Sequence, residues 1–339
     1  MKDITNYSLL SHNTFGIDAA CHRFIEYETT EEACRAAEII GSGNAPLLIV
    51  GSGSNLLLTK DFNGTVVHSA IKGIHLININ KQGDVFLRCG SGETWDDVVA
   101  HCVSNGYYGA ENLSLIPGEV GASAVQNIGA YGSEVACLIE SIEAVDIQSK
   151  QHVVIACEEC HYGYRQSRFK GEWHNRFLIT HVTYRLSTTF QPKLDYGNIR
   201  TALAEKGIEN PTAQQLRQTI INIREAKLPN PKVLGNAGSF FMNPVVSIEK
   251  YSELAARYPG MPHYPIDASH EKIPAGWLIE QCGWKGRSLG RAGVHNRQAL
   301  VLVNHGQASG QEILHLCETI QNDVEAKFGI HINPEVNII

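Results

Sequence analysis

A single hydroxyl group stands between a glycine and two phenylalanines in residues 236–244, which read Asn-Ala-Gly-Ser-Phe-Phe-Met-Asn-Pro. A serine in such a desolvated setting, here Ser239, could donate a proton to a strongly basic carbanion. It does not fit the nucleophile of a hydrolase, because the G-x-S-x-G pattern is absent. A serine after a glycine is more often a hydrogen-bonded turn residue, so the sequence leaves both roles open.

A glycine-serine turn at residues 51–55 (Gly-Ser-Gly-Ser-Asn) directly follows the apolar run of residues 46–50. Its glycines allow positive φ angles, and successive backbone N–H groups in such a turn can face a diphosphate. The dinucleotide fingerprint requires glycine where this chain has Leu56, and the lysine of a P-loop is absent. On its own, the turn favours a tight loop over a phosphate site.

Residues 114–132 form a second candidate, rich in glycine, alanine and serine and free of lysine and arginine. Small side chains let the backbone approach a flat ligand, and the amides of Gln126 and Asn127 could satisfy the donors and acceptors of a heterocycle. We therefore predict ligand contact here in preference to an elaborate structural loop.

Cations stand beside aromatic rings in residues 161–168, where Arg165 is suited to bidentate capture of a carboxylate or phosphate. Arg168 and Lys170 fit a solvated edge better. Residues 157–161 (Cys-Glu-Glu-Cys-His) match the haem c attachment pattern. Haem c attachment requires export, and a zinc site would need a second pair of ligands, so we interpret the cysteines as incidental thiols.

The elements that must position these residues alternate between helix and strand. Capping boxes predict helices after Thr29, Thr94, Thr212 and Ser309. Strands are predicted at residues 46–50, buried on both faces, at 177–186, where apolar and polar residues alternate, and at 238–242. The pattern is that of a mixed α+β protein with boundaries near residues 68 and 228.

Length and charge narrow the class of protein. With 339 residues the chain fits two or three domains, and its net charge of −7 gives no reason to expect nucleic-acid binding. Nine cysteines without framework spacing indicate reduced thiols. The N-terminus lacks a signal-peptide core and no apolar run reaches ~20 residues, so we expect a cytoplasmic protein that does not enter a membrane.

In their order and spacing, these motifs resemble the UDP-N-acetylenolpyruvoylglucosamine reductase family, flavoenzymes that make UDP-N-acetylmuramate for peptidoglycan. The resemblance runs from Asn-Thr-Phe-Gly at residues 13–16 to Pro-Glu-Val at residues 334–336. Its most specific parts are residues 51–55, 116–118, 126–132, 163–165 and 236–241.

The resemblance implies an α+β fold with a two-part FAD-binding domain of the p-cresol methylhydroxylase/vanillyl-alcohol oxidase (PCMH) type and a C-terminal α+β substrate domain. The implied parts are residues 1–67 with 329–339 returning to the active site, 68–228, and 229–328 for the UDP-sugar. It further implies non-covalent FAD, NADPH as reductant, no metal and a monomer. The implied FAD contacts are Gly51, Ser52, Gly53, Ser54, Asn55, Ile116, Pro117, Gly118, Gly121, Ala122, Ser123, Gln126, Asn127, Gly129, Ala130 and Tyr131. The implied substrate contacts are Tyr196, Lys227, Asn243 and Gln281, with Tyr264 on the covering loop of the longer subtype.

The chemistry of such a reaction can be argued from the substrate, UDP-N-acetylglucosamine enolpyruvate. Its alkene is conjugated to a carboxylate, so hydride from reduced FAD should add at the terminal carbon and leave an enolate. A catalyst must stabilise that enolate and protonate the carbon that bears the ether oxygen. By the resemblance, Arg165 and Glu335 are the stabilising pair and Ser239 is the proton donor. Taken alone, Glu335 would be an exposed carboxylate.

Rival interpretations remain open at this point. One is an oxidase of a small alcohol or sugar on the same FAD-binding fold, although no histidine for covalent flavin attachment lies in residues 51–55. Another is a nucleotide-sugar binding protein without flavin, which would have no use for Ser239 and Glu335 together. A haem carrier is the third, and it would require export.

Overall fold

The computed structural model describes residues 1–43 and 45–339. These residues form two compact units, each built from several stretches of the chain. Unit 1 consists of Met1–Tyr7, Cys21–Ser52 and Asn63–Ala226, and unit 2 consists of Ser8–Ala20, Gly53–Phe62 and Lys227–Ile339.

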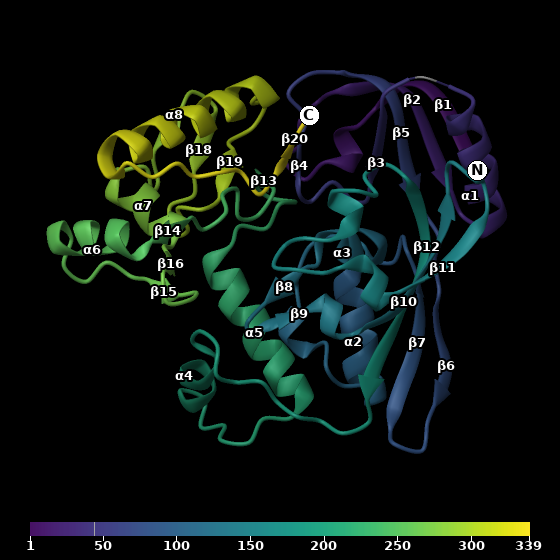
Figure 1. Cartoon of the computed structure of the whole chain (residues 1–339), viewed down its shortest axis with the longest axis horizontal. Coiled ribbons are helices and arrows are strands. Elements are labelled where there is room, and N and C mark those ends of the chain that lie inside the picture. Colours follow the sequence, from purple (N-terminus) through teal and green to yellow (C-terminus); the bar gives the residue numbers. More distant parts are fainter. Residues whose placement is uncertain (44) are drawn as a thin grey trace. The chain divides into compact units, whose positions relative to one another are not determined.

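The first sheet of unit 1 has the strand order β1-β2-β5-β3 (Figure 1). Its strands are β1 (Lys2–Ser8), β2 (Ala20–Tyr27), β5 (Phe62–Ser69) and β3 (Leu47–Val50), and β3 runs parallel to β5. The prediction that residues 46–50 are buried on both faces is wrong, because β3 lies at the sheet edge and all four of its residues are half-buried.

Helix α1 (Thr30–Gly41) follows β2 and begins after Thr29 as predicted, although the Glu32 side chain binds the Glu28 amide and not that of Thr29. The Thr29 hydroxyl accepts a hydrogen bond from the Glu32 amide at 3.2 Å, and the Glu32 carboxylate accepts one from the Glu28 amide at 2.8 Å. The helix buries three alanines, Ala33, Ala36 and Ala37, against the sheets.

The second sheet of unit 1 is antiparallel, in the order β11-β10-β12-β7-β6. Its strands are β6 (Ile74–Ile79), β7 (Asp84–Gly90), β10 (Ile139–Asp146), β11 (His152–Ala156) and β12 (Phe177–Ser187). The predicted strand at 177–186 is confirmed, but it is buried on both faces over most of its length. Leu178 packs in the cluster under α1, whereas Ile179 and Val182 pack in the cluster that contains α2 (Trp95–Asn105) and α3 (Val120–Gln126).

Two further helices complete unit 1 and enclose a small apolar cluster. They are α4 (Ile199–Ala204) and α5 (Ala213–Lys227), whose last residue belongs to unit 2. Thr212 caps α5 as predicted, since its hydroxyl accepts the Gln215 amide and its own amide donates to the Gln215 side chain. Thr94 precedes α2 as predicted, but its side chain makes no capping bond.

Unit 2 contains three small sheets. One has the order β13-β19-β18-β17, one the order β14-β16-β15, and the third joins β4 to β20 in parallel. Their bounds are β4 (Leu56–Leu57), β13 (Gly235–Asn236), β14 (Val245–Ser247), β15 (Tyr264–Pro265), β16 (His270–Lys272), β17 (Ser288–Leu289), β18 (Ala292–Val294), β19 (Leu302–Asn304) and β20 (Asn337–Ile338). The strand predicted at 238–242 is wrong: β13 ends before this range, at Asn236, and within it only an isolated bridge at Phe241 forms.

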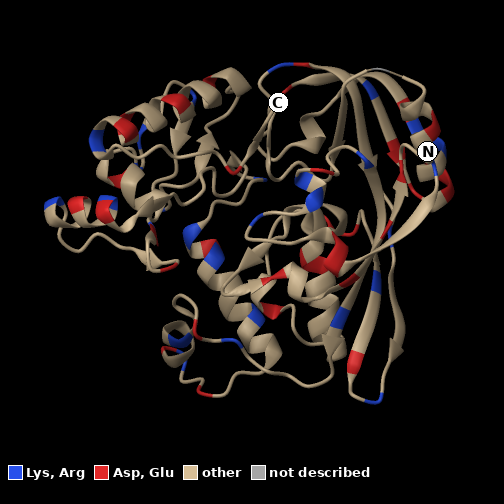
Figure 2. Cartoon of the chain, in the orientation of Figure 1, with Lys and Arg blue, Asp and Glu red and all other residues tan. Residues whose placement is uncertain are grey.

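The helices of unit 2 are α6 (Ile248–Arg257), α7 (Ala275–Gln281) and α8 (Gly310–Phe328), and α8 packs on β18, β19 and α7. The capping box at Ser309 is confirmed, and Gly329 ends α8 with φ +62°. Acidic and basic residues are interspersed along α6 and α8, as they are along α1 of unit 1 (Figure 2). Among the helices described, none is long and apolar enough to cross a membrane.

Candidate active site

Unit 2 lays the segment of Ser239 alongside the C-terminal segment of Glu335. The Glu335 amide donates to the Phe240 carbonyl at 2.8 Å, and the Met242 amide donates to the Asn333 carbonyl at 2.9 Å. These two bonds flank the antiparallel bridge between Phe241 and Pro334. The fold therefore brings two predicted catalytic residues, 96 positions apart by number, to adjoining positions on paired backbone.

The glycine-serine turn joins the same place from the other side. The Asn55 side-chain amide donates to the Glu335 carbonyl at 3.2 Å, and the Asn337 amide donates to the Asn55 carbonyl at 3.1 Å. These bonds lead into the parallel pair of β4 and β20. Residues Gly53–Asn55, Ser239 and Glu335 are thus assembled within unit 2.

Ser239 is exposed, whereas the two phenylalanines after it are buried in the core of unit 2. Gly238 adopts φ +71°, and its amide donates to the Asn236 side chain at 2.9 Å, which turns the backbone outward at the serine. The expectation that the phenylalanine rings desolvate the hydroxyl is therefore wrong, because both rings point into the core.

Thr14 links the turn to the serine segment, and the sequence reasoning gave it no role. Its hydroxyl donates to the Asn236 carbonyl at 2.7 Å, its amide donates to the Gly53 carbonyl at 3.2 Å, and its carbonyl accepts the Asn236 amide at 3.0 Å. Gly53 has φ +67°, and a Cβ there would lie 1.9 Å from the His12 carbonyl oxygen. The Asn-Thr-Phe-Gly motif at residues 13–16 marked Thr14 as part of the resemblance. The motif alone does not show that Thr14 binds Gly53 and Asn236.

Replacing Thr14 by valine should lower the free energy of unfolding by about 1–2 kcal/mol, because the Asn236 carbonyl loses its donor. The measurement is urea unfolding of parent and variant. Thr319→Val is the matched control, since its hydroxyl donates only to the His315 carbonyl of its own helix. An equal loss in the two variants would contradict the linking role of Thr14.

Unit 1 holds Arg165 against the loop of residues 114–132. Arg165 Nη2 donates to the Gly129 carbonyl at 2.7 Å, and Nη1 donates to the Asn127 carbonyl at 3.3 Å. A Cβ at Gly129 would lie 3.3 Å from Nη1, so the guanidinium packs directly on this glycine. The predicted cation and the predicted ligand loop therefore form one surface.

Asn127 is fully buried, and its side chain is used inside the protein. Its amide nitrogen donates to Glu134 and to the Gly163 carbonyl, each at 2.8 Å, while its oxygen accepts the Ala136 amide at 3.1 Å. The Asn127 side chain therefore holds the loop together. The expectation that it would hydrogen-bond a heterocycle is wrong. A ligand contact at this residue would come from its backbone.

Tyr196 lies beside the end of the same loop, where a Cβ at Gly132 would be 3.3 Å from the Tyr196 Cβ. Lys227 is exposed at the last position of α5. Asn243 binds the amide of Ala275 at the start of α7, at 2.9 Å, whereas Gln281 is the last residue of α7. Since a seven-residue helix rises by about 9 Å, Asn243 and Gln281 lie at opposite ends of this helix and are not brought together.

Tyr264 lies on a small hairpin in which it pairs with Lys272, and its side chain is exposed. The hairpin is anchored by His263, which stacks on Tyr251 with ring centroids 4.3 Å apart and contacts Glu271 Oε2 at 3.0 Å. An exposed aromatic residue on an anchored hairpin is available to cover a ligand.

Asp96 and Arg217 fix the start of the ligand loop, and sequence reasoning missed both. Arg217 donates to the two carboxylate oxygens of Asp96 at 2.7 and 3.0 Å, and Asp96 also accepts the Leu115 amide. Burial by itself would raise the pKa of Asp96, but the bonds from Arg217 and Leu115 lower it below its usual value.

Replacing Asp96 by asparagine should lower the free energy of unfolding by about 2–3 kcal/mol at pH 7, because Arg217 is left buried without its anion. A carboxyl group with a lowered pKa stabilises the fold above its ordinary pKa of about 3.9, and this stabilisation is lost as the pH falls through the lowered value. Urea unfolding of parent and variant should therefore differ most at neutral pH and converge in acid. If the free energies of unfolding of parent and variant differ by the same amount at neutral and acidic pH, the ion pair does not stabilise the fold as expected.

Comparisons with known proteins match both parts of the chain. Residues 22–154 match an FAD binding domain, and residues 230–339 match the C-terminal domain of UDP-N-acetylenolpyruvoylglucosamine reductase. Proteins named UDP-N-acetylenolpyruvoylglucosamine reductase from Bacteroides fragilis and Porphyromonas gingivalis are 52% and 47% identical to this chain, and each alignment covers 98% of it. The aligned regions span 99% and 98% of those relatives.

A solved structure shows the same fold. The UDP-N-acetylenolpyruvylglucosamine reductase (MurB) from Thermus caldophilus has a TM-score of 0.67 at 23% sequence identity, with 99% of this chain and 98% of that chain covered. The predicted α+β fold class, with an FAD-binding domain and a C-terminal α+β domain, is confirmed.

Proposed function

Since this chain belongs to the UDP-N-acetylenolpyruvoylglucosamine reductase family and carries its FAD-binding domain, we propose which of its residues perform the reduction. Ser239 is the proton donor, and Arg165 and Glu335 stabilise the enolate. The observation that carries this proposal is the hydrogen bond from the Glu335 amide to the Phe240 carbonyl, which fixes Glu335 beside Ser239.

The residues proposed to hold FAD fit an extended, flat cofactor. A Cβ at Gly51 would lie 3.1 Å from the Ala122 Cβ and 3.1 Å from Glu119 Oε2, so the turn and the 116–131 loop form one continuous surface in unit 1. Backbone there would contact FAD at Gly51, Ser52 and the loop residues, and Gly53–Asn55 would add contacts from unit 2. When bound, FAD supplies the hydride that the terminal alkene carbon receives.

The protein's own residues then complete the reaction. A cationic guanidinium at Arg165 favours negative charge on the substrate carboxylate as the enolate forms. Ser239 donates its proton to the carbon that bears the ether oxygen, which a strongly basic enolate permits. Tyr196, Lys227, Asn243 and Gln281 are proposed to contact the UDP part, with Tyr264 of the longer subtype closing over it.

NADPH is the proposed reductant, and the protein is proposed to act as a cytoplasmic monomer divided into residues 1–67 with 329–339, 68–228 and 229–328. The nine cysteines are free thiols, which supports a reducing compartment.

The experiment that tests the proposed function is an anaerobic visible spectrum of the purified protein, before and after NADPH and then after UDP-N-acetylglucosamine enolpyruvate. The flavin band should bleach with NADPH and return with the sugar. A band that ignores the sugar and returns only with oxygen would favour the oxidase interpretation.

A further inference from the structure

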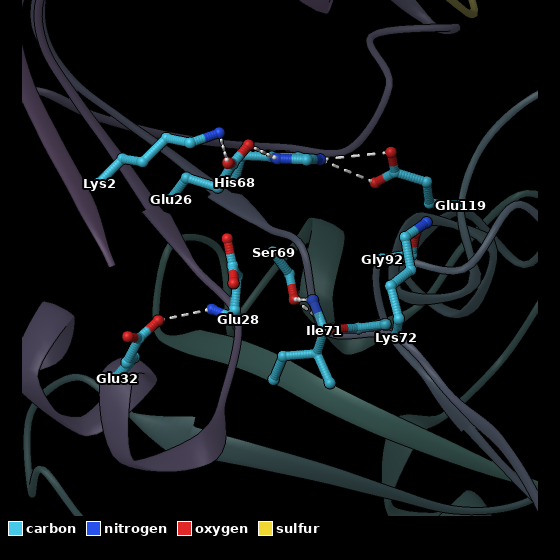
Figure 3. A network of polar contacts seen from close by, with 11 residues as sticks. Lys2, Glu26, Glu28, Glu32, His68, Ser69, Ile71, Lys72, Gly92 and Glu119 are labelled. Atoms are coloured by element: carbon cyan, nitrogen blue, oxygen red, sulfur yellow. Dashed lines mark hydrogen bonds and ion pairs between the residues drawn. The ribbon is translucent and has the colours of Figure 1, made fainter.

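A row of side chains with alternating charge crosses the first sheet of unit 1 and ends at the proposed flavin surface (Figure 3). Lys2 on β1 contacts Glu26 on β2, and Glu26 Oε2 lies 2.9 Å from His68 Nδ1 on β5. His68 Nε2 lies 3.2 Å from each carboxylate oxygen of Glu119, in the turn before α3. The row therefore consists of cation, anion, histidine and anion.

The geometry around His68 is that of a protonated ring. A neutral imidazole has one N–H to donate, whereas an imidazolium has two, and here both ring nitrogens face carboxylate oxygens. Burial alone would lower the pKa of His68, but its hydrogen bonds and charge interactions with Glu119 and Glu26 raise it above its usual value. The carboxylates in contact with the ring belong to Glu26 on β2 and Glu119 in the turn, and Lys2 contacts Glu26. The ring of Phe24 lies alongside His68, with centroids 6.5 Å apart.

Glu119 connects this row to both halves of the FAD surface in unit 1. It is the N-cap residue of α3, where its carbonyl accepts the Ser123 amide at 2.8 Å. Its carboxylate lies against Gly51, as the 3.1 Å distance from a Gly51 Cβ to Glu119 Oε2 shows. Any movement of this carboxylate must therefore disturb the contact between the glycine-serine turn and α3.

We propose that His68 is a positioning residue of the flavin site, whose protonated ring holds the Glu119 carboxylate against Gly51, so that FAD is bound more weakly as the pH rises. The inference rests on the proposed FAD contacts at Gly51, Gly118, Gly121 and Ala122. When the ring loses its proton, one N–H remains for two carboxylates. Glu26 keeps Lys2 as a cation, whereas within the described part of the chain no cationic side chain other than His68 is ion-paired with Glu119.

The direction in which FAD affinity changes with pH follows from the charges. A Glu119 carboxylate released from its cation leaves negative charge on the turn that is proposed to contact the FAD diphosphate, and like charges repel. In the folded protein, protonated His68 has two carboxylate partners, which raise the pKa of the ring. The Glu119 carboxylate is therefore fully held in place below the ordinary histidine pKa of about 6.5, and this hold is lost as the pH rises through the raised pKa. A coupling of one pKa unit between proton and FAD corresponds to about a tenfold change in the Kd of FAD.

The test dilutes the holoenzyme at a series of pH values, from about 6, below the ordinary histidine pKa, up to about 9, and measures released FAD by its fluorescence. The Kd of the parent should rise about tenfold over this range. His68→Gln should bind FAD with a higher Kd at low pH and a flat profile. Glu119→Gln should also be flat but retain the affinity, because it removes the repelling charge.

His152→Gln is the matched control, since His152 lies 3.5 Å from Glu143 in another ion pair of unit 1 and should leave the parent profile unchanged. Equal pH slopes in the parent, His68→Gln and Glu119→Gln would overturn the proposal, and so would a flattened profile in the control. If His68→Gln fails to fold, the pH profile of the FAD Kd in Glu119→Gln tests the proposal by itself. A parent purified without flavin, and unable to take up added FAD, would instead overturn the assigned FAD contacts.

Discussion

Alanine in place of Ser239 should leave the reduction of the bound flavin by NADPH unchanged, while it slows reoxidation of the flavin by the enolpyruvyl sugar about 10³-fold or more. The physical reason is that the proton is needed only in the second half-reaction, where the enolate carbon has to be protonated. Gly238 and the buried Phe240 hold the backbone on either side of the serine, so the loss of one exposed oxygen should not disturb the fold.

Stopped-flow spectroscopy of the flavin band measures the two half-reactions separately. Ser252→Ala is a suitable control, because Ser252 is another exposed serine of unit 2 whose hydroxyl donates to the Ile248 carbonyl within α6. The control should match the parent in both half-reactions. If Ser239→Ala slows flavin reduction as much as reoxidation, Ser239 is not the proton donor.

Glutamine in place of Glu335 should slow the same reoxidation about 10²-fold or more and should also remove one ionisation from its pH profile. Glutamine has nearly the shape of glutamate, so the hydrogen bond from the backbone amide of residue 335 to the Phe240 carbonyl should persist. A glutamate beside the substrate carboxylate is expected to share a proton with it, because like charges repel. In the parent, the rate should therefore fall as the pH rises and this proton is lost, whereas the variant should show no such fall.

The measurement is the rate of reoxidation as a function of pH at saturating substrate. Glu325→Gln is the control, since this carboxylate is exposed on α8 and lies 3.0 Å from the His331 ring. It should reproduce the parent profile. A Glu335→Gln profile with the parent's shape would show that Glu335 does not carry the shared proton.

Local signals in the sequence were sufficient for α1, α5 and α8, whereas α3 lies inside residues 114–132, where a ligand loop was predicted, and α4 was not predicted. The signals at Thr29, Thr212 and Ser309 each place donor and acceptor within four residues, so they specify a helix start without reference to the rest of the chain. Strand predictions depended on what covers each strand. Residues 47–50 lie at an edge and residues 177–187 lie between two clusters, and neither fact is encoded in a local pattern.

Resemblance to a family names candidate site residues one by one, but it does not say how the fold assembles them. No spacing rule places Glu335 beside Ser239 or ties Asn55 to Glu335, because those contacts depend on chain segments far apart in sequence. The same holds for His68, which meets Glu26 and Glu119 from different strands and turns. The environment of Ser239 was mispredicted, since adjacent phenylalanines signal apolar surroundings without indicating which way their rings turn.

The pairing of β4 with β20 affects how the protein is made in the cell. Asn55 leaves the ribosome long before its partners Glu335 and Asn337, which are translated some 280 residues later. Strand β4 therefore stays solvated or transiently covered until those residues have been made. Contacts of such long range are closed late and slowly. The surface of unit 2 that carries Asn55 and Glu335 should thus be among the last parts of the newborn chain to become protected from proteases.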